Sequence, residues 1–531
     1  MQVLAAYLQN SDYDKRSAEF LIRGFVEGFK INYTGPRVAT KCSNLKSARE
    51  NELQIVEKVF KEIHAGRVAG PFRSRPFPNL RLSPIGLVPK KDGSFRLIHH
   101  LSFPANSSVN SFIDKSFCSV NYSSLDDAVN LLSLLGTGAL MGKIDLKSAF
   151  RLLPIHPSDF ELLGFRLNDM FFFDKCLPMG CSVSCSLFEE FSTCLEWLLR
   201  KQSGQESVVH YLDDFLFAGK AGDNACNELM LTFVELCRQL GVPLADDKTV
   251  WPTTSLIFLG FELDSVEMKI KIPVDKLYSL KDLIICFLAR KKATLKEFQA
   301  LAGLLNFCLR AIPPARAFTR RIYDVMQGVV KPHHFIRVSV AVKDDLRVWL
   351  TFLDLFNGCY YFPQIDWVDD EHLQLFTDSA GNLDLGCGAF FRNHWLFFKW
   401  PTEWAGTEAM RDITFLELVP IVLAIHAWGN QLTSKKIVFR VDNEALVAIL
   451  NKKSSKSKRV MGLIRPLVLQ SMLSAIQFKA CHILGVHNEV ADALSRCQFQ
   501  RFRTLVPQAD LEPTPIPDSF LTIISRLSLT D

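Results

Sequence analysis

The chain has 531 residues, which is too long for one hydrophobic core and predicts about three or four domains. Hydrophobic residues make up 48% and charged residues 22%, a balance typical of folded globular proteins that argues against disorder. The formal net charge of +5 permits nucleic-acid binding without requiring it, so any basic surface must come from local clustering of charge.

The cysteines and the apolar runs of the sequence indicate the expected cellular compartment. The 14 cysteines are scattered, without the paired CxxC spacing of a zinc site, and no secretory signal is recognisable at the start. We therefore expect reduced thiols in an intracellular protein of the cytoplasm or the nucleus. No uninterrupted apolar run approaches the length that spans a bilayer, so no membrane partner is expected.

Residues 1–70 are predicted to form a helical extension. Apolar clusters within residues 18–29 suggest a short amphipathic segment at its start. Residues 45–65 carry apolar side chains at spacings of three and four, which predicts one amphipathic helix. The members of that apolar face are Leu53, Val56, Val59, Phe60 and Ile63. Asn44 or Ser47 is the expected cap of the helix.

Residues 83–98 are predicted to form a β-hairpin. Two apolar strands flank Asp92-Gly93, a favoured turn pair, and basic residues lie on both sides of the turn. A charged turn is more often ordinary solvated surface than a functional site. The pattern alone therefore leaves open whether Lys90, Lys91 and Arg96 have a function.

The stretch from Val209 to Ala218 carries the strongest chemical signal. Two runs rich in aromatic and β-branched residues flank Asp213-Asp214, which predicts two strands with a pair of carboxylates at their turn. Adjacent carboxylates repel each other, and burying both is costly unless a cation compensates. Since Mg²⁺ takes hard oxygen ligands, the pair is a candidate metal site. A solvent-facing turn is the simpler alternative, because aspartate is common in turns.

A third carboxylate, Asp145, follows a strand-like run upstream. Two metal ions held by such carboxylates stabilise the attacking and leaving oxygens of an in-line phosphoryl displacement. The ordered motifs resemble the palm of a reverse transcriptase. They are Asp145 with Phe150 five places on, Leu177-Pro178-Met179-Gly180, Tyr211-Leu212-Asp213-Asp214, Asp247-Lys248-Thr249 and Phe258-Leu259-Gly260-Phe261.

The resemblance implies a mixed α/β (α+β) right-hand polymerase. Its expected parts are fingers and palm over 71–265, a thumb over 266–335 and a connection over 336–370. Residues 256–263 would form a hairpin that grips the primer. Residues 277–309 are predicted to be helical, and their basic side chains are candidates for contacts with duplex phosphates (Lys291, Lys292, Lys296 and the adjacent Arg310).

The resemblance also implies roles for single residues. Asp145, Asp213 and Asp214 would be catalytic and, with Leu146, would hold two Mg²⁺ ions, with Mn²⁺ as an alternative. The residues expected to bind the incoming nucleotide are Lys90, Lys91, Arg96, Phe150, Met179, Gly180, Tyr211 and Lys248.

Three of these nucleotide-binding roles are open to a simpler interpretation or rest on a weaker match. Phe150 would lie beneath the sugar and exclude a 2′-hydroxyl, although a core position is the commoner fate of phenylalanine. Met179 stands where retroviral enzymes often carry glutamine, which weakens any claim about a side-chain hydrogen bond there, whereas Gly180 still permits close backbone approach. Lys248 would donate a proton to the leaving pyrophosphate or clamp a phosphate, but a loop lysine is usually solvated.

A second set of carboxylates follows in residues 371–500. Asp378 ends a predicted strand, and a second strand is predicted over 386–391. Glu417 lies on a predicted helix over 413–428, Asp442 follows a predicted strand over 436–441, and Asp492 lies on a last helix. This order resembles ribonuclease H, whose four carboxylates hold two metal ions for hydrolysis of RNA in a hybrid. Taken singly, each acid is more often a surface residue.

Two further segments complete the chain. The basic run over 452–459 could hold the hybrid backbone through phosphate contacts, with a solvated loop or a nuclear import signal as alternatives. Residues 501–531 form a proline-containing tail that we expect to be loosely ordered.

The amino-acid sequences of residues 413–420, 485–496 and 502–513 resemble those of the DIRS-like retrotransposons, which pair this module with a tyrosine recombinase.

The expected function is an RNA- and DNA-directed DNA polymerase with ribonuclease H. Its expected partners are an RNA template, a DNA primer, an RNA–DNA hybrid and dNTPs, with a separately encoded tyrosine recombinase and a Gag-like protein. A catalytically inactive or domesticated nucleic-acid-binding relic is the main alternative. A maturase-like splicing cofactor would need an RNA-binding extension where the ribonuclease H pattern stands.

Overall fold

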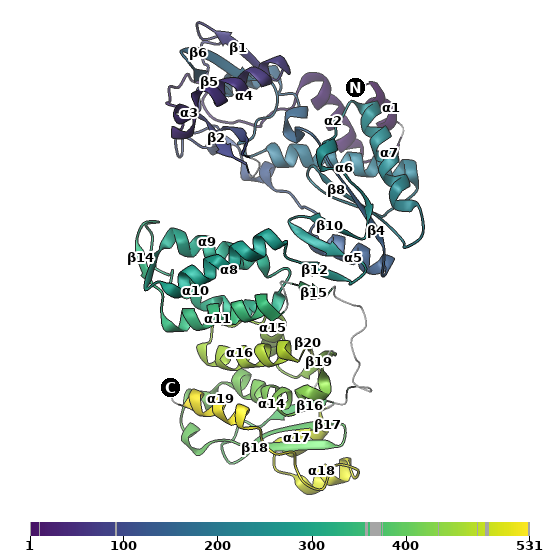
Figure 1. Ribbon diagram of the computed structural model, residues 1–531, viewed down its shortest axis with the longest axis vertical. Coiled ribbons are helices and arrows are strands. Elements are labelled where there is room, and N and C mark those ends of the chain that lie inside the picture. The colour runs from purple at the N-terminus through teal and green to yellow at the C-terminus, as the bar shows by residue number, and fades with distance from the viewer. Residues whose placement is uncertain are drawn as a thin grey trace. The chain divides into compact units, whose positions relative to one another are not determined.

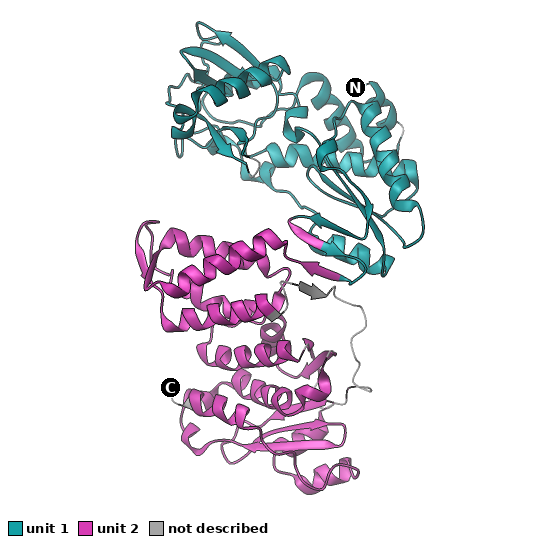
Figure 2. Ribbon diagram, in the orientation of Figure 1, with its two compact units in different colours: residues 1–259, 263–268 teal, residues 260–262, 269–531 magenta. Residues whose placement is uncertain are grey.

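Two structural units make up the chain, as a computed structural model shows (Figures 1 and 2). Unit 1 comprises residues 1–259 and 263–268, and unit 2 comprises 260–262 and 269–531. The structure describes residues 2–9, 11–90, 93–355, 359–361, 373, 375–433, 435–474, 476–483 and 488–528. The predicted nucleotide-binding residue Lys91 and the first residue of the predicted last helix, His487, lie outside the described residues.

Unit 1 begins with the helices α1 (Gln2–Leu8), α2 (Lys15–Glu27), α3 (Lys46–Glu50) and α4 (Glu52–His64). The single helix predicted over 45–65 is wrong, because the chain breaks at Asn51. Neither α3 nor α4 has a side-chain cap, so the expected roles of Asn44 and Ser47 are wrong too. Of the predicted apolar face, Val59 is buried as expected, whereas Leu53 and Phe60 are exposed, and α4 also buries Ile55, which was not predicted.

The fingers-like part of unit 1 holds a sheet in the order β1 (Val68–Phe72), β6 (Met170–Asp174) and β5 (Gly164–Leu167). Beside it lies the predicted hairpin, β2 (Ile85–Pro89) paired antiparallel with β3 (Phe95–His99). The hairpin and α4 share one core, since Ile55 and Val59 cluster with Ile85 and Leu87. This shared core holds the strands of the hairpin, and therefore the position of its basic turn, relative to α4.

The palm-like part is an antiparallel sheet in the order β7 (Val208–Tyr211), β8 (Asp214–Gly219), β4 (Leu140–Asp145) and β9 (Val250–Thr253). The helices α6 (Ser184–Ser203) and α7 (Ala225–Leu240) pack against it. Phe215 and Phe217 of β8 are fully buried against Phe233 of α7. The alternation of side chains along the strands therefore directs the apolar face toward the helices.

The next strands are β10 (Ser255–Phe258) and β11 (Phe261–Asp264), as predicted for 256–263. In unit 2, α8 (Val274–Ala289) and α9 (Leu295–Cys308) replace the continuous helical stretch predicted over 277–309. That prediction is wrong at its centre, where β13 (Lys292–Thr294) pairs with β14 (Phe335–Arg337). Thr294 then restarts the helix with a capping box to Glu297.

The C-terminal half of unit 2 has an antiparallel sheet of β16 (Leu375–Ser379), β17 (Gly386–Phe391) and β18 (His394–Lys399). A parallel pair follows, β19 (Lys436–Val441) with β20 (Gln477–His482). The connecting helices are α14 (Ile413–Trp428), α15 (Glu444–Lys452), α16 (Lys458–Leu473) and α17 (Glu489–Ser495). The bounds predicted for β17, α14 and β19 are confirmed.

Helix α14 with the turn after it, Ile413–Leu432, is long and apolar enough to cross a membrane by length and composition, which differs from our expectation for the sequence. Its most apolar window has a mean hydropathy of 1.4 and is 72% buried inside the protein. It packs against β16, β17 and α16. Burial of this kind identifies the core helix of an α/β domain.

The tail over 501–531 is not loosely ordered in its described part. Helix α18 (Phe499–Leu505) and helix α19 (Asp518–Ser528) lie in it. Phe502 packs on Phe390 and Trp395 of the β17–β18 sheet, and the Trp395 indole donates to the carbonyl of Asp510 at 2.8 Å. The prolines end helices here, but the apolar residues between them anchor the segment.

A buried ion-pair cluster joins the earlier helices of unit 2 to its C-terminal half. Asp345 of α11 (Val340–Leu355) binds Arg321 of α10 (Arg320–Asp324) at 2.8 Å and lies 3.5 Å from Arg465 of α16. The side chain of Asp345 is only 2% exposed. The segments predicted as thumb, connection and ribonuclease H-like domain thus share one unit.

Candidate active sites

The palm-like sheet brings three predicted carboxylates together. Antiparallel register places Asp145, the last residue of β4, opposite Asp214, the first residue of β8. Asp213 lies in the tight turn before β8, where Leu212 has a φ of +53°. The carbonyl of Asp213 accepts a hydrogen bond from the Leu146 N–H at 2.8 Å, which ties this turn to the end of β4.

The electrostatics of this cluster reflect crowding of like charges. The pKa of Asp214 is raised to about 6: burial is the largest cause, Lys143 opposes it, and the charges of Asp145 and Asp213 add to it. Burial also raises the pKa of Asp213, with Asp145 as the next cause. The buried Oδ1 of Asp214 has no hydrogen-bond partner in the described chain and lies 3.5 Å from Lys143 Nζ. A cation near these oxygens would relieve their repulsion.

Lys248 reaches the same cluster. Its Nζ donates to Oδ1 of Asp145 at 2.9 Å. Burial lowers the pKa of Lys248, but the hydrogen bond to Asp145 and the charges of Asp145 and Asp213 outweigh burial, so the pKa is raised. The ammonium group therefore stays protonated beside the carboxylates, and its expected role toward phosphate stays a prediction.

The hairpin of β2 and β3 contributes Arg96. Its charge lowers the pKa of Asp213, which places the guanidinium in the electrostatic field of the cluster. Arg96 and Lys90 are both exposed, and the Lys90 N–H closes the turn by donating to the carbonyl of Ser94 at 2.7 Å. The structure thus connects Arg96 to the site and leaves Lys90 as an exposed turn residue.

Gly180 and Met179 pack against the base of the same hairpin. Gly180 has a φ of +121°, and a Cβ there would come within 2.0 Å of the His99 carbonyl oxygen. The His99 N–H donates to the carbonyl of Met179 at 3.1 Å. Only glycine allows this approach, so the predicted close backbone contact exists, although its partner here is protein backbone.

Phe150 and Tyr211, two residues predicted to bind the nucleotide, are both half-buried. Phe150 lies on a 3₁₀ turn (Ala149–Leu152), and its ring meets Phe188 edge-on at 5.5 Å. Tyr211 is paired with Asp214 across the hairpin, and its ring lies 4.8 Å from that of Tyr122. Both rings have one side in the core and part of their surface free, which agrees with either role considered for Phe150.

Behind the carboxylates lies a buried charged group that the sequence prediction missed. His210 is 5% exposed, and its ring lies between Glu196, which contacts Nδ1, and Glu189, 3.3 Å from Nε2. Burial opposes its charge, but both glutamates favour it, so the pKa of His210 rises to about 9. The available signal was a histidine in an otherwise apolar strand, with two glutamates seven residues apart on α6.

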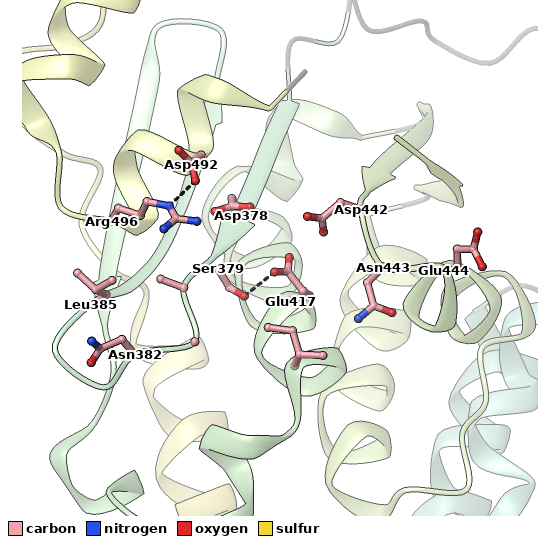
Figure 3. Close-up of a pocket in the computed structure, with 13 residues that line it drawn as sticks. Asp378, Ser379, Asn382, Leu385, Glu417, Asp442, Asn443, Glu444, Asp492 and Arg496 are labelled. Atoms are coloured by element: carbon pink, nitrogen blue, oxygen red, sulfur yellow. Dashed lines mark hydrogen bonds and ion pairs between the residues drawn. The ribbon is translucent and has the colours of Figure 1, made fainter. Parts of the chain in front are cut away.

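The second predicted set of carboxylates lines one cavity of about 800 Å³ (Figure 3). Asp378 comes from β16, Glu417 from α14, Asp442 from the end of β19 and Asp492 from α17. The other lining residues are Ser379, Ala380, Gly381, Asn382, Leu385, Ile413, Asn443, Glu444 and Arg496. Four segments far apart in sequence therefore deliver the four acids to one place.

Two serine hydroxyls that the sequence prediction missed orient these acids. Ser379 donates to Oε1 of Glu417 at 2.9 Å, and Ser495 donates to Oδ2 of Asp378 at 2.6 Å. Each serine lies within three residues of a predicted carboxylate, one after Asp378 and three after Asp492, which was the only local signal.

Burial and mutual repulsion also shift the titration of these acids. Burial raises the pKa of Glu417 to about 9, and the charges of Asp378 and Asp442 add to the shift. Burial raises the pKa of Asp378 to about 7, against the hydrogen bond from Ser495. Asp492 is different: burial raises its pKa, but hydrogen bonds from Arg496 and Arg501 outweigh burial and lower it.

Both carboxylate sets have the donor chemistry that Mg²⁺ prefers, hard and closely spaced oxygens. The raised pKa values of Asp214, Asp378 and Glu417 indicate that these three acids disfavour their charge without a counter-ion. Within the described residues, no three His, Cys, Asp or Glu side chains are arranged so that they could hold a metal ion as they stand. The residues therefore fit the ion by chemistry, while side-chain adjustment would have to complete the coordination.

The basic run over 452–459 is only partly a solvated loop. Lys453 ends α15 with a φ of +53°, and its Nζ lies 4.7 Å from the centre of the Phe478 ring. Burial, with the nearby charge of Arg316, lowers the pKa of Lys453 to about 8. Lys452 and Lys456 are exposed.

Comparison with known proteins matches a family model described as "Reverse transcriptase (RNA-dependent DNA polymerase)" to residues 88–263. The chain is 26% identical over 304 residues to the Gag-Pro-Pol polyprotein of Mason-Pfizer monkey virus, covering 55% of this chain and 15% of that protein. It is 20% identical over 482 residues to the transposon Tf2-3 polyprotein of Schizosaccharomyces pombe, covering 88% of this chain and 32% of that protein. The chain thus spans less than a third of each of these relatives.

The fold has a counterpart among solved structures. A foamy viral protease-reverse transcriptase in complex with double-stranded DNA matches with a TM-score of 0.50 and 15% identity, over 91% of this chain and 82% of that one. The predicted fold class, a mixed α/β right-hand polymerase, is confirmed. The matched residues 88–263 include Asp145, Asp213 and Asp214.

Proposed function

We propose that this chain, whose residues 88–263 form a reverse transcriptase domain of the retroviral and long-terminal-repeat retrotransposon type, is an RNA- and DNA-directed DNA polymerase that also carries ribonuclease H activity. The observation that carries the polymerase proposal is the register of Asp145 opposite Asp214, with Asp213 in the adjoining turn. A protein that only binds nucleic acid has no need for three clustered carboxylates, because phosphates are repelled by them.

In this proposal Asp145, Asp213 and Asp214, with the carbonyl of Leu146, would hold Mg²⁺ or Mn²⁺. When bound, the ions would stabilise charge on the attacking and leaving oxygens of nucleotidyl transfer. Arg96 would bind the triphosphate of the incoming dNTP, since a guanidinium matches phosphate oxygens. Lys248, held protonated beside Asp145, would supply a proton to the leaving pyrophosphate.

The ribonuclease H part of the proposal rests on the cavity in unit 2. Asp378, Glu417, Asp442 and Asp492 line it, in the order that the sequence resemblance required. Ser379 and Ser495 donate hydrogen bonds that fix the orientation of two of these acids. Supporting hydrogen bonds of this kind are typical of a functional site. Its substrate would be the RNA strand of an RNA–DNA hybrid.

The biological setting that we propose is a retroelement of the DIRS-like type. The support for this setting is the resemblance of residues 413–420, 485–496 and 502–513 to the sequences of that class of retrotransposon. The partners would be an RNA template, a DNA primer and dNTPs, with a tyrosine recombinase and a Gag-like protein encoded separately by the element. The protein would act inside the cell, in the cytoplasm or the nucleus.

A primer-extension assay on poly(rA)/oligo(dT) tests the polymerase directly. We expect the purified chain to extend the primer with dTTP, and Asp213→Asn or Asp145→Asn to abolish extension while hybrid binding persists. Asp169→Asn is the matched control, because this aspartate is exposed at 89% on a surface turn. Extension by the Asp213→Asn chain at the normal rate would show that the palm-like carboxylates are not catalytic.

Degradation of a labelled RNA–DNA hybrid tests the second activity. Asp378→Asn should remove RNA cleavage and leave primer extension intact, because the two carboxylate sets lie in different units. A chain that binds hybrid but neither extends primers nor cleaves RNA would instead be the inactive relic.

A further inference from the structure

Asp492 differs from the other acids of the cavity in its partners. Its Oδ1 binds Nε of Arg496, and its Oδ2 accepts a hydrogen bond from Nη1 of Arg501 at 2.8 Å. Asp378 and Glu417 accept from serine hydroxyls instead. Both oxygens of Asp492 are therefore occupied by guanidinium groups, which we call the arginine clamp.

The arginine clamp is built from two elements. Arg496 follows the last turn of α17, whereas Arg501 lies on α18. The next residue, Phe502, is fully buried and packs on Phe390 and Trp395, which fixes α18 against the sheet. The fold itself thus holds Arg501 beside Asp492, which lowers the entropy cost of the pair.

Arg496 is also placed to meet a ligand. Among the thirteen described residues that line the cavity, it is the only Lys or Arg. Its side chain is 55% exposed, and Figure 3 shows its guanidinium between Asp492 and Asp378. Its charge lowers the pKa of Asp378, so it acts on more than one acid. A planar guanidinium binds a phosphate through two parallel hydrogen bonds, as it binds a carboxylate.

We propose that the arginine clamp is a lock on Asp492 that a phosphate of the RNA–DNA hybrid opens. In the free protein, Arg496 and Arg501 hold the carboxylate of Asp492. When a hybrid enters the cavity, one of its phosphates takes Arg496, and Oδ1 of Asp492 becomes free to join Asp378, Glu417 and Asp442 as a cation ligand, while Arg501 still holds Oδ2. The inference rests on the proposed ribonuclease H function and adds that hybrid and cation bind cooperatively.

Competition for one carboxylate makes this coupling unavoidable. A divalent cation that takes Oδ1 of Asp492 competes with the guanidinium of Arg496 for that oxygen, so the clamp lowers cation affinity. A phosphate that takes Arg496 lowers that cost, and by linkage the cation raises hybrid affinity by the same factor. The site would then load its ions mainly when a substrate is present, which limits unwanted cleavage.

Cation binding measured by calorimetry tests the lock without any activity readout. The full chain would carry Asp145→Asn and Asp213→Asn, so that the palm-like set does not contribute, and Mn²⁺ would be the probe. Combining Arg496→Gln with Arg501→Gln should raise Mn²⁺ affinity about fivefold, the size expected for a partly exposed ion pair. Arg392→Gln, in the exposed turn between β17 and β18, removes one positive charge from the same half of the unit and should change nothing.

Asp492→Asn separates the lock from a general charge effect. In that background the two arginine substitutions should no longer raise Mn²⁺ affinity. An equal rise in the Asp492→Asn chain, whose amide carries no charge for the arginines to hold, would mean that they act only by repelling the cation, and the lock would be wrong. No rise in the chain that keeps Asp492 would also overturn it.

A hybrid whose RNA strand is 2′-O-methylated cannot be cleaved and completes the test. It should raise Mn²⁺ affinity in the chain with both arginines and have little effect after their substitution. Mn²⁺ binding that ignores the arginines would overturn the lock and leave the ribonuclease H proposal standing. No Mn²⁺ binding with or without the hybrid would overturn both.

Discussion

Asp145 and Asp214 face each other in register across β4 and β8, and each is bound by its own lysine. Lys248 contacts Asp145 at 2.9 Å, and Lys143 lies 3.5 Å from Asp214. Two cations thus offset two carboxylates that the strand pairing forces together. The pairing, rather than the turn sequence alone, sets the spacing of the acids, so changes that disturb the sheet or its neighbours should affect catalysis.

Substitution of Phe150 tests the proposed discrimination against ribonucleotides. The ring is half-buried against Phe188 and keeps part of its surface exposed. Phe150→Val should shift the ratio of rNTP to dNTP incorporation upward by about tenfold, the scale of one steric contact. Measuring kcat/KM for both nucleotides checks this. An unchanged ratio with lower stability would identify Phe150 as a core residue only.

Gly180→Ala should damage the contact between the hairpin and the palm-like part. The new Cβ would lie 2.0 Å from the His99 carbonyl oxygen at a φ of +121°, so backbone must move. We expect a loss of about 2–4 kcal/mol in unfolding free energy and a lower rate of extension. Gly241→Ala is the control, since it has a φ of +70° but no atom within 4 Å of the new Cβ. Equal losses in the two variants would contradict the importance of the close approach.

His210 should make the stability of unit 1 depend on pH. Its pKa of about 9 in the folded chain lies above the ordinary 6.5, so its contribution is complete below pH 6.5 and is lost as pH rises through 9. The contribution is at most about 3 kcal/mol. Urea unfolding at several pH values should show that His210→Gln is most destabilising near pH 6 and matters little above pH 10. His394→Gln, an exposed partner of Asp510, should show a much smaller effect.

Glu417→Gln should trade activity for stability. The pKa of Glu417 is about 9 in the folded chain against an ordinary 4.5, so stability falls as pH rises through the window between these values. A neutral amide removes that fall. We expect the melting temperature at pH 8 to rise by about 2–5 °C, with no gain near pH 4, while RNA cleavage is lost. A lower melting temperature at pH 8 would contradict the proposed burial of charge.

The sequence predicted those elements whose pattern is local and strong. Helix α14 and the strand β19 were predicted at their observed bounds because long apolar runs end at clear polar residues. The carboxylates of both sites were found because each follows or lies on such an element. Arg96 could be named from its hairpin, but its effect on Asp213 depends on packing between segments that are distant in sequence.

The wrong predictions of secondary structure and order have a common physical cause: tertiary contacts determined the structure of these segments. Asn51 breaks a helix whose apolar spacing looked continuous, and the two parts, α3 with Ala48 and α4 with Ile55 and Val59, both pack into the core of the hairpin. Residues 292–294 become a strand through pairing with 335–337, which local propensity could not reveal. The tail was misjudged because its prolines were visible in sequence, whereas the partners of Phe502 were not.

The ion-pair cluster around Asp345 has a practical consequence for cutting the chain. A fragment that starts at residue 371 would carry Arg465, 13% exposed in the intact chain, without its acidic partner on α11. An unpaired buried guanidinium is strongly destabilising, so such a fragment should aggregate or express poorly. A fragment meant to keep the ribonuclease H-like fold should instead begin near residue 269, where the two units divide. The segments predicted as thumb, connection and ribonuclease H-like domain would therefore have to be expressed and engineered together, as one piece.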